Sequence, residues 1–164
     1  MKTTILFPLF SLLILSCNNS AESTAENSDT MNHDSHMNMD KVEMPAMPAT
    51  PADASVYFVN LKDGQDVSSP VKVEMGVTNL SVDTANGILK PASGHHHILI
   101  DIDSIATETI VPKDSVHLHF GNAQTSAEVP LSPGKHTLTL QFADAMHRSY
   151  GSKLSARVTV NVKE

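Results

Sequence analysis

The amino-acid sequence predicts an all-β domain over residues 55–164, preceded by a disordered tether. Several segments of the domain alternate between apolar and polar residues with a period of two, the pattern of half-buried antiparallel strands. Glycine, proline, asparagine and aspartate separate these segments, and no stretch carries the 3.6-residue apolar stripe of a helix. About seven short strands in about 110 residues predict an immunoglobulin-like antiparallel β-sandwich, with a small barrel as the alternative.

The alternation is clearest at residues 71–77, where the odd positions are apolar and the even positions are polar or glycine. Residues 136–142 place Leu138, Leu140 and Phe142 on one face, and residues 156–162 repeat the pattern. We expect further strands at residues 56–60, 95–102 and 116–120, and weaker ones at 107–111 and 125–129. Turn signals lie between them at residues 62–64, 69–70, 86–87, 91–94, 120–122 and 132–134.

Residues 1–16 have the features of an export signal. Lys2 supplies the positive start, and residues 5–15 form an apolar run. This run is shorter than the roughly 20 residues that a helix needs to span a bilayer, so we expect it to be removed rather than to remain as an anchor.

The single cysteine, Cys17, directly follows this run, after Ile14, Leu15 and Ser16. The arrangement resembles the lipobox of bacterial lipoproteins, and that resemblance implies that Cys17 is acylated and becomes the first residue of the mature chain. We therefore expect a lipid-anchored protein of the cell envelope, at the outer membrane or the periplasmic face. An ordinary secretory peptide with a chance cysteine is the alternative.

Residues 17–54 are expected to form a disordered acidic linker between the lipidated cysteine and the domain. From residue 18 onward the linker contains seven acidic residues, one basic residue and no aromatic residue. Such a composition buries too little apolar area to offset the chain entropy lost on folding. The net charge of the whole chain is −7, which argues against a nucleic-acid partner, because phosphate contacts need a basic face.

The linker contains an unusual group of methionines and histidines at Met31, His33, His36, Met37 and Met39. Thioether sulfur is a soft ligand suited to Cu(I), and imidazole suits Cu(II), Zn(II) and Ni(II). The interleaved pattern resembles the tails of bacterial envelope proteins that handle copper. The alternatives are drift in an unconstrained linker and a methionine tract that scavenges oxidants.

Two His-x-His pairs are the strongest candidates for a metal site in the domain. In a strand at 95–102, His95 and His97 project away from the apolar face, and His117 and His119 do the same at 116–120. The Cβ atoms of each pair lie about 7 Å apart, twice the strand rise, so two rings can converge on one ion. If the two strands are neighbours, the four rings form one cluster.

Other polar side chains are expected to support this cluster or the fold. Asp101 and Asp103 share the face of His95 and His97 and could orient their rings. His136 stands at the entrance of an apolar face, near a turn, and is a further candidate metal ligand. A structural role is the first reading for His136, as for two other histidines, His96 and His147, and His96 is expected to be a buried ring that hydrogen-bonds to the backbone. A hydrogen-bond network without metal and a pH-responsive cluster are the alternatives to a metal site.

Several motifs of the domain resemble a bacterial family catalogued as domain of unknown function 4399. They are Gly94-His95-His96-His97-Ile98-Leu99-Ile100-Asp101, His117-Leu118-His119-Phe120-Gly121, Gln124-Thr125 and Pro133-Gly134-Lys135-His136-Thr137-Leu138, and the likeness covers most of residues 55–162. The resemblance implies a small secreted β domain with a histidine-rich signature, and His136 carries over together with the two His-x-His pairs. Members often have a longer histidine-containing end, of which this chain keeps only His147.

The expected function is that of an envelope lipoprotein that binds copper, or failing that zinc, through the domain histidines and the linker. The alternative is a non-catalytic structural or interaction module of the envelope, with another envelope protein as its partner and structural histidines. Enzyme function is not expected. A cupin-like oxygenase site begins with His-x-His, but Glu128 follows His119 at too long a spacing.

Overall fold

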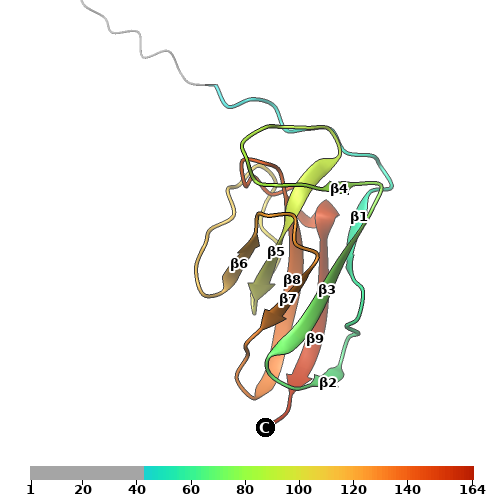
Figure 1. Ribbon diagram of the computed structural model, residues 1–164, viewed down its shortest axis with the longest axis vertical. Helices are drawn as coiled ribbons and strands as arrows, with labels where there is room; N and C mark the ends of the chain where they lie inside the picture. The colour runs from blue at the N-terminus through green and yellow to red at the C-terminus, as the bar shows by residue number, and fades with distance from the viewer. Residues whose placement is uncertain (1–42) are drawn as a thin grey trace, which may run out of the picture. The chain divides into compact units, whose positions relative to one another are not determined.

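The structure, a computed structural model, describes residues 43–164, which form one compact unit (Figure 1). Within these residues there is no α-helix, only one 3-10 turn, η1 (Ser152–Leu154), and no helix that is long and apolar enough to cross a membrane. The prediction of an all-β fold is confirmed.

Two sheets pack face to face in a sandwich (Figure 1). The small sheet has the order β1-β3-β7, from β1 (Ser55–Phe58), β3 (Val71–Thr78) and β7 (Ser126–Val129). The large sheet has the order β2-β9-β8-β5-β4, and β6 pairs with β5 outside this order; it contains β2 (Gln65–Val67), β4 (Ser81–Val82), β5 (Ser93–Ile100), β6 (His117–Phe120), β8 (Gly134–Ala143) and β9 (Ser155–Val162).

The strand pairing is antiparallel except at two short strands. β2 runs parallel to β9, and β4 runs parallel to β5. These two strands contain three and two residues, too few for an alternating pattern to be visible in the sequence. The chain thus has more strands than the seven expected. Of the two weaker candidates, residues 125–129 contain β7, whereas residues 107–111 form no strand. They make an isolated bridge between Ile110 and Arg148 and further backbone hydrogen bonds to Ser149 and His147.

The main core lies between the two sheets. Apolar residues at every second position of β3, β8 and β9 are buried there, as the alternation predicts. The fully buried side chains include Val73, Ile98, Leu138, Leu140 and Phe142.

The outer face of the large sheet is also covered, which the sequence did not predict. Leu99 of β5 and Ala143 of β8 form a second small core with Val111, and Ile102 and Ile105 pack against it. The polar side chains on this face of β8 are therefore buried: Thr139 donates a hydrogen bond to the Ile102 carbonyl at 2.7 Å, and Gln141 accepts one from the Ile105 amide at 3.0 Å. β5 is consequently enclosed on both faces.

Residues 43–54, which we assigned to the linker, belong to the compact unit. The Ala49 carbonyl accepts a hydrogen bond from the Ala92 amide at 2.9 Å, and the Pro45 carbonyl accepts one from the guanidinium of Arg148. Ala54 and Met47 pack against the main core. The segment before β1 therefore lies against the loops that follow β4 and β8.

Candidate metal centre

Three consecutive histidines of β5 alternate between the two faces of the large sheet. His96 points toward the small sheet, and His95 and His97 point outward, as the alternation predicts. The register with β8 places His95 opposite Ala143 and His97 opposite Gln141. Because the outer face is covered, His95 and His97 are at most 1% exposed.

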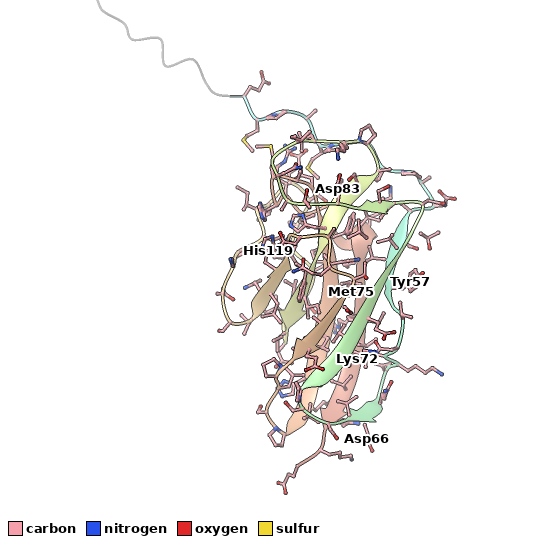
Figure 2. The ribbon with its side chains drawn as sticks, in the orientation of Figure 1. Tyr57, Asp66, Lys72, Met75, Asp83 and His119 are labelled. Atoms are coloured by element: carbon pink, nitrogen blue, oxygen red, sulfur yellow. The ribbon has the colours of Figure 1, made fainter. Side chains whose placement is uncertain are left out.

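β6 brings a third ring, His119, beside this pair. His119 lies directly opposite His97 in the antiparallel pairing of β5 with β6, and opposite residues of such a pair share a face. The ring centroid of His119 lies 5.1 Å from the centroids of both His95 and His97. His119 is only partly buried, and Figure 2 shows it on the β6 side of the molecule, away from Tyr57 of β1.

The turn that follows β8 supplies a fourth ring, His147. Its centroid lies 4.8 Å from that of His119, 5.0 Å from that of His95 and 6.2 Å from that of His97. The turn is closed by a hydrogen bond of 2.9 Å from the His147 amide to the Asp144 carbonyl. We had assigned His147 a structural role, so this residue of the cluster was missed.

The ring nitrogens face one another in two close pairs. The Nε2 atoms of His95 and His97 are 2.9 Å apart, and those of His119 and His147 are 3.1 Å apart. Metal–nitrogen bonds of about 2.0–2.1 Å separate neighbouring ligand nitrogens by about 3.3 Å in a tetrahedral site and about 2.9 Å in a square-planar site. The separation within each pair therefore fits two neighbouring ligands of one ion, and it equally fits a hydrogen bond between two imidazoles.

His95, His97 and His119 could hold a metal ion. Each offers a ring nitrogen, these nitrogens lie within 4.8 Å of one another, and no carboxylate among the described residues belongs to the group. The prediction of a histidine metal site that joins two strands is thus supported for three of its four strand residues.

Three rings of the cluster, those of His95, His97 and His119, favour the neutral imidazole, the protonation state that binds metal. Burial lowers the pKa of His95 to about 3 and that of His97 to about 2, and the neighbouring imidazoles add repulsion against a second positive charge. Burial also lowers the pKa of His119, followed by repulsion from His147 and Lys113. At neutral pH the rings therefore present lone pairs rather than charges.

Gly121 makes room for the ring of His119. A Cβ atom at position 121 would lie 2.4 Å from both Nε2 and Cε1 of His119 and 3.0 Å from the Cβ of Ala85. No real contact is that short, so the ring occupies space that only glycine leaves free. The sequence motif His-x-Gly, in which Gly121 follows His119 by two residues, thus has a steric basis.

His117 does not join the cluster, and the prediction of four converging strand histidines is wrong in this respect. Its Nδ1 atom lies 2.9 Å from both carboxylate oxygens of Asp114, and Asp114 Oδ1 also accepts hydrogen bonds from the amides of Val116 and His117. The imidazole is therefore bound to the turn that precedes β6, because a local carboxylate competes successfully for it.

His136 also lies apart from the cluster. Its Nδ1 atom is 2.8 Å from Asp101 Oδ2, and its Nε2 atom lies near the Ser132 carbonyl and hydroxyl, at 3.1 and 3.2 Å. Asp101 therefore binds the start of β8 and does not orient the rings of β5. Asp103 pairs with Arg157, so the prediction that these two aspartates support the metal ligands is wrong.

The Nδ1 atoms of His95 and His97 have no hydrogen-bond partner among the described residues. A metal-binding histidine usually donates its second ring N–H to an acceptor, which fixes the ring. In this site packing must hold the two inner rings instead, because the surrounding segments enclose them completely.

His96 occupies the main core, as expected, but without the expected hydrogen bond. Its ring packs edge-on against Phe142, with centroids 5.2 Å apart, and neither of its nitrogens has a partner among the described residues. Burial lowers its pKa to about 4.

The remaining predicted ligands lie outside the described residues. They are Met31, His33, His36, Met37 and Met39 of the linker, and the lipidation site Cys17 lies outside them as well. Their assignments remain predictions.

Residues 73–163 match the model of a family described as a domain of unknown function, DUF4399. The matched segment contains all four histidines of the cluster as well as His117 and His136. Neither the comparison with curated proteins nor the comparison with solved structures returned a match.

Proposed function

The chain belongs to the DUF4399 family, and we propose that it binds a copper ion through His95, His97, His119 and His147. The observation that carries this proposal is the convergence of Nε2 atoms from β5, β6 and the turn after β8, in pairs 2.9 and 3.1 Å apart. Close packing of four basic nitrogens costs free energy unless a proton or an ion lies between them.

The ligand set favours copper over zinc. Affinity of nitrogen sites for divalent ions rises to Cu(II) and falls at Zn(II), and imidazole also binds Cu(I). No carboxylate belongs to the ligand group in the described chain, so the charge of the ion is not neutralised. Burial then penalises a doubly charged ion more than a singly charged one. The divalent order favours Cu(II) over Zn(II), and the uncompensated charge favours Cu(I) over Cu(II), so we propose Cu(I) as the bound ion.

The linker extends this proposal. Met31, Met37 and Met39 would capture Cu(I) with His33 and His36, and their attachment to the same chain raises the ion concentration near the domain. Acylation of Cys17 would hold the protein at the cell envelope. The task would be storage, delivery or protection, without catalysis.

A structural module is the second candidate, and the contacts of His117 and His136 favour it. Each of these rings binds a carboxylate that also accepts backbone hydrogen bonds, so each stabilises a turn. If the clustered rings serve the same purpose, the domain would contact another envelope protein and bind no ion.

Titration of the full-length chain with Cu(I), Cu(II) and Zn(II) distinguishes the two candidates. Cys17→Ser in every sample removes the thiol as a competing ligand. We expect saturable Cu(I) binding that survives replacement of the linker ligands (Met31→Leu, His33→Ala, His36→Ala, Met37→Leu, Met39→Leu).

Within that linker variant, His95→Ala with His97→Ala should remove the remaining ion. His117→Ala with His136→Ala is the matched control, because it removes two histidines of the same domain and should leave binding unchanged. Absence of saturable binding tighter than millimolar in the parent chain would favour the structural module.

A further inference from the structure

We propose that His147 is the exchangeable ligand of the metal centre, the position at which the ion enters and leaves. This inference rests on the proposed copper binding and assigns a different role to one of the four rings. The acceptor that takes the ion would be a soft donor, such as a thiolate, a thioether or an imidazole, which replaces His147 on the metal.

The backbone of His147 differs from that of the other three ligands. His95, His97 and His119 belong to β5 and β6, where strand pairing holds the chain on both sides of β5. His147 lies in a turn and has a φ of 67°, a left-handed conformation that costs free energy for a residue with a side chain. Three ligands are thus fixed by the sheet, and one is held by a turn.

One ring distance agrees with this division. Centroid distances among His95, His97 and His119 are 4.7, 5.1 and 5.1 Å. His147 is as close to His119 and His95, at 4.8 and 5.0 Å, but lies 6.2 Å from His97. The group whose nitrogens all lie within 4.8 Å of one another contains only the three strand residues. A three-coordinate ion can therefore stay on the strands when His147 leaves.

Burial places His147 at the accessible side of the centre. His95 and His97 are enclosed, whereas His119 and His147 are only partly buried. An incoming ligand can reach the ion past these two outer rings. Of the two, His119 is fixed by its strand and by its close fit to Gly121, so His147 is the ring that can move.

The turn is anchored at both ends by Asp144 and Arg148. Two carbonyls of its tip also accept hydrogen bonds, that of Ala145 from the Gly87 amide at 3.1 Å and that of His147 from the Val111 amide at 2.9 Å, so the backbone is held and only side-chain rotation can move the His147 ring. Asp144 Oδ1 accepts hydrogen bonds from the amides of Met146 and Arg148 at 2.8 and 2.9 Å, and Oδ2 pairs with the Arg148 guanidinium at 2.7 Å. Asp144 and Arg148 are buried, whereas residues 145–147 between them are only partly buried. The side chain of His147 can swing away while the base of the turn keeps its place.

The step breaks one bond and forms another. The bond between the ion and His147 Nε2 would break first, and a bond would form between the ion and the donor atom of the acceptor. The released lone pair of His147 would accept a hydrogen bond from water, and the oxidation state of the ion would not change. Three strand imidazoles would hold the ion until the acceptor has attached, and their bonds to the ion would then break as further donors of the acceptor replace them.

Transfer of Cu(I) to the chromogenic chelator bicinchoninate tests this assignment. The full-length chain is used with Cys17→Ser and the linker substitutions given above, so that only the domain site is loaded. In the parent chain we expect one ion, transferred at a rate that rises with chelator concentration. His147→Ala should still hold one ion and transfer it roughly tenfold faster, because differences of this kind appear mainly in dissociation.

His119→Ala is the matched control, since it removes the other partly buried ring and should abolish stoichiometric binding. His147→Met should restore slow transfer, because a thioether can replace the fourth ligand for Cu(I). Urea unfolding of each metal-free variant checks that the fold is kept.

Two results overturn the assignment. If His147→Ala loses the ion as completely as His119→Ala, or transfers it at the parental rate, His147 is not the exchangeable ligand although the site binds copper. If the parent chain binds no ion, the proposed function fails and the assignment fails with it.

Discussion

The two faces of β5 carry the same residue type and give it different surroundings. His96, on the inner face, packs against Phe142 in an apolar core, and its nitrogens have no partner in the described chain. His95 and His97, on the outer face, lie against the imidazoles of His119 and His147. Burial lowers the pKa of all three rings, so their protonation does not distinguish them.

This difference shows that the side chains packed against a buried histidine determine whether its ring can act as a metal ligand. On the inner face the neighbouring side chains are apolar, so the His96 ring is a buried polar group without partners, which lowers the stability of the fold. On the outer face the neighbouring side chains offer further nitrogen donors, and binding of the proposed ion would offset the same cost.

Of the predicted effects, acidification should change the free energy of unfolding most, and it should act on the histidines of both faces of β5. The histidine pKa falls from its usual 6.5 to about 3, 4 and 2 at positions 95, 96 and 97. Above pH 6.5 these rings are neutral in both the folded and the unfolded chain, so they cause no loss of stability. As the pH falls below this value, these histidines become protonated in the unfolded chain but stay neutral in the folded chain. Stability of the metal-free protein should then fall by about 1.4 kcal/mol per pH unit for each ring, measured by urea unfolding.

Bound Cu(I) should distinguish the two faces, because it would oppose protonation of His95 and His97 on the outer face and leave His96 unaffected. We expect the ion to move the acid midpoint to lower pH in the parent chain and to have no such effect when His95 and His97 are both replaced by alanine. Stability that stays constant from pH 7 to pH 5 in the metal-free protein would contradict the neutral state of the buried rings.

Leucine substitutions on the two faces of β5 should have different effects. The effect on the free energy of unfolding is expected to be about 1–3 kcal/mol. His96→Leu removes two buried nitrogens without partners and should raise the free energy of unfolding by about this amount. It should leave ion binding intact. His97→Leu, its matched counterpart, should abolish ion binding. Urea unfolding and Cu(I) titration of both variants provide the measurement, and a loss of ion binding in His96→Leu would break the distinction.

Gly121→Ala should act on the outer face alone. The added methyl group must displace the His119 ring, so we expect ion affinity to fall roughly tenfold, about 1.4 kcal/mol. The clash is with a side chain, and the sheet should keep its fold. Competition with a chelator measures the affinity. Unchanged affinity would mean that His119 does not need its present position to bind the ion.

His136→Ala should have the smallest effect. Its partner Asp101 is half exposed, and pairs of this kind contribute about 0–1 kcal/mol. We expect a small decrease in the unfolding free energy and unchanged ion binding. A lost metal site in this variant would show that the start of β8 is coupled to the outer face of β5.

Local patterns predicted much of the fold. The alternation at β3, β8 and β9 gave the inner face correctly because one side of each strand packs in the core. β2 and β4 were missed because they are short. The covering of the outer face was missed because it depends on residues 102–111, which form no strand and pack through a few apolar side chains. The weak strand pattern at 107–111 gave no indication of this packing.

The sequence predicted those residues of the site whose positions follow from strand geometry. His95, His97 and His119 follow from alternation and from the pairing of β5 with β6. His117 shares their face but binds Asp114, a contact three residues away that alternation does not consider. His147 was missed because a turn has no periodicity. The only available signal was a histidine close after β8, the strand next to β5.

The enclosure of β5 on both faces also determines how the amides of this molecule exchange with deuterium. Central amides of β5 and β8 lie in paired strands under two cores, so their hydrogens should be replaced only when the whole domain opens. Residues 145–147, which are partly buried and belong to no strand, should be labelled through small local fluctuations. If the proposed ion binds at these strands, its release would require local opening at residues 145–147 and no opening of the whole domain.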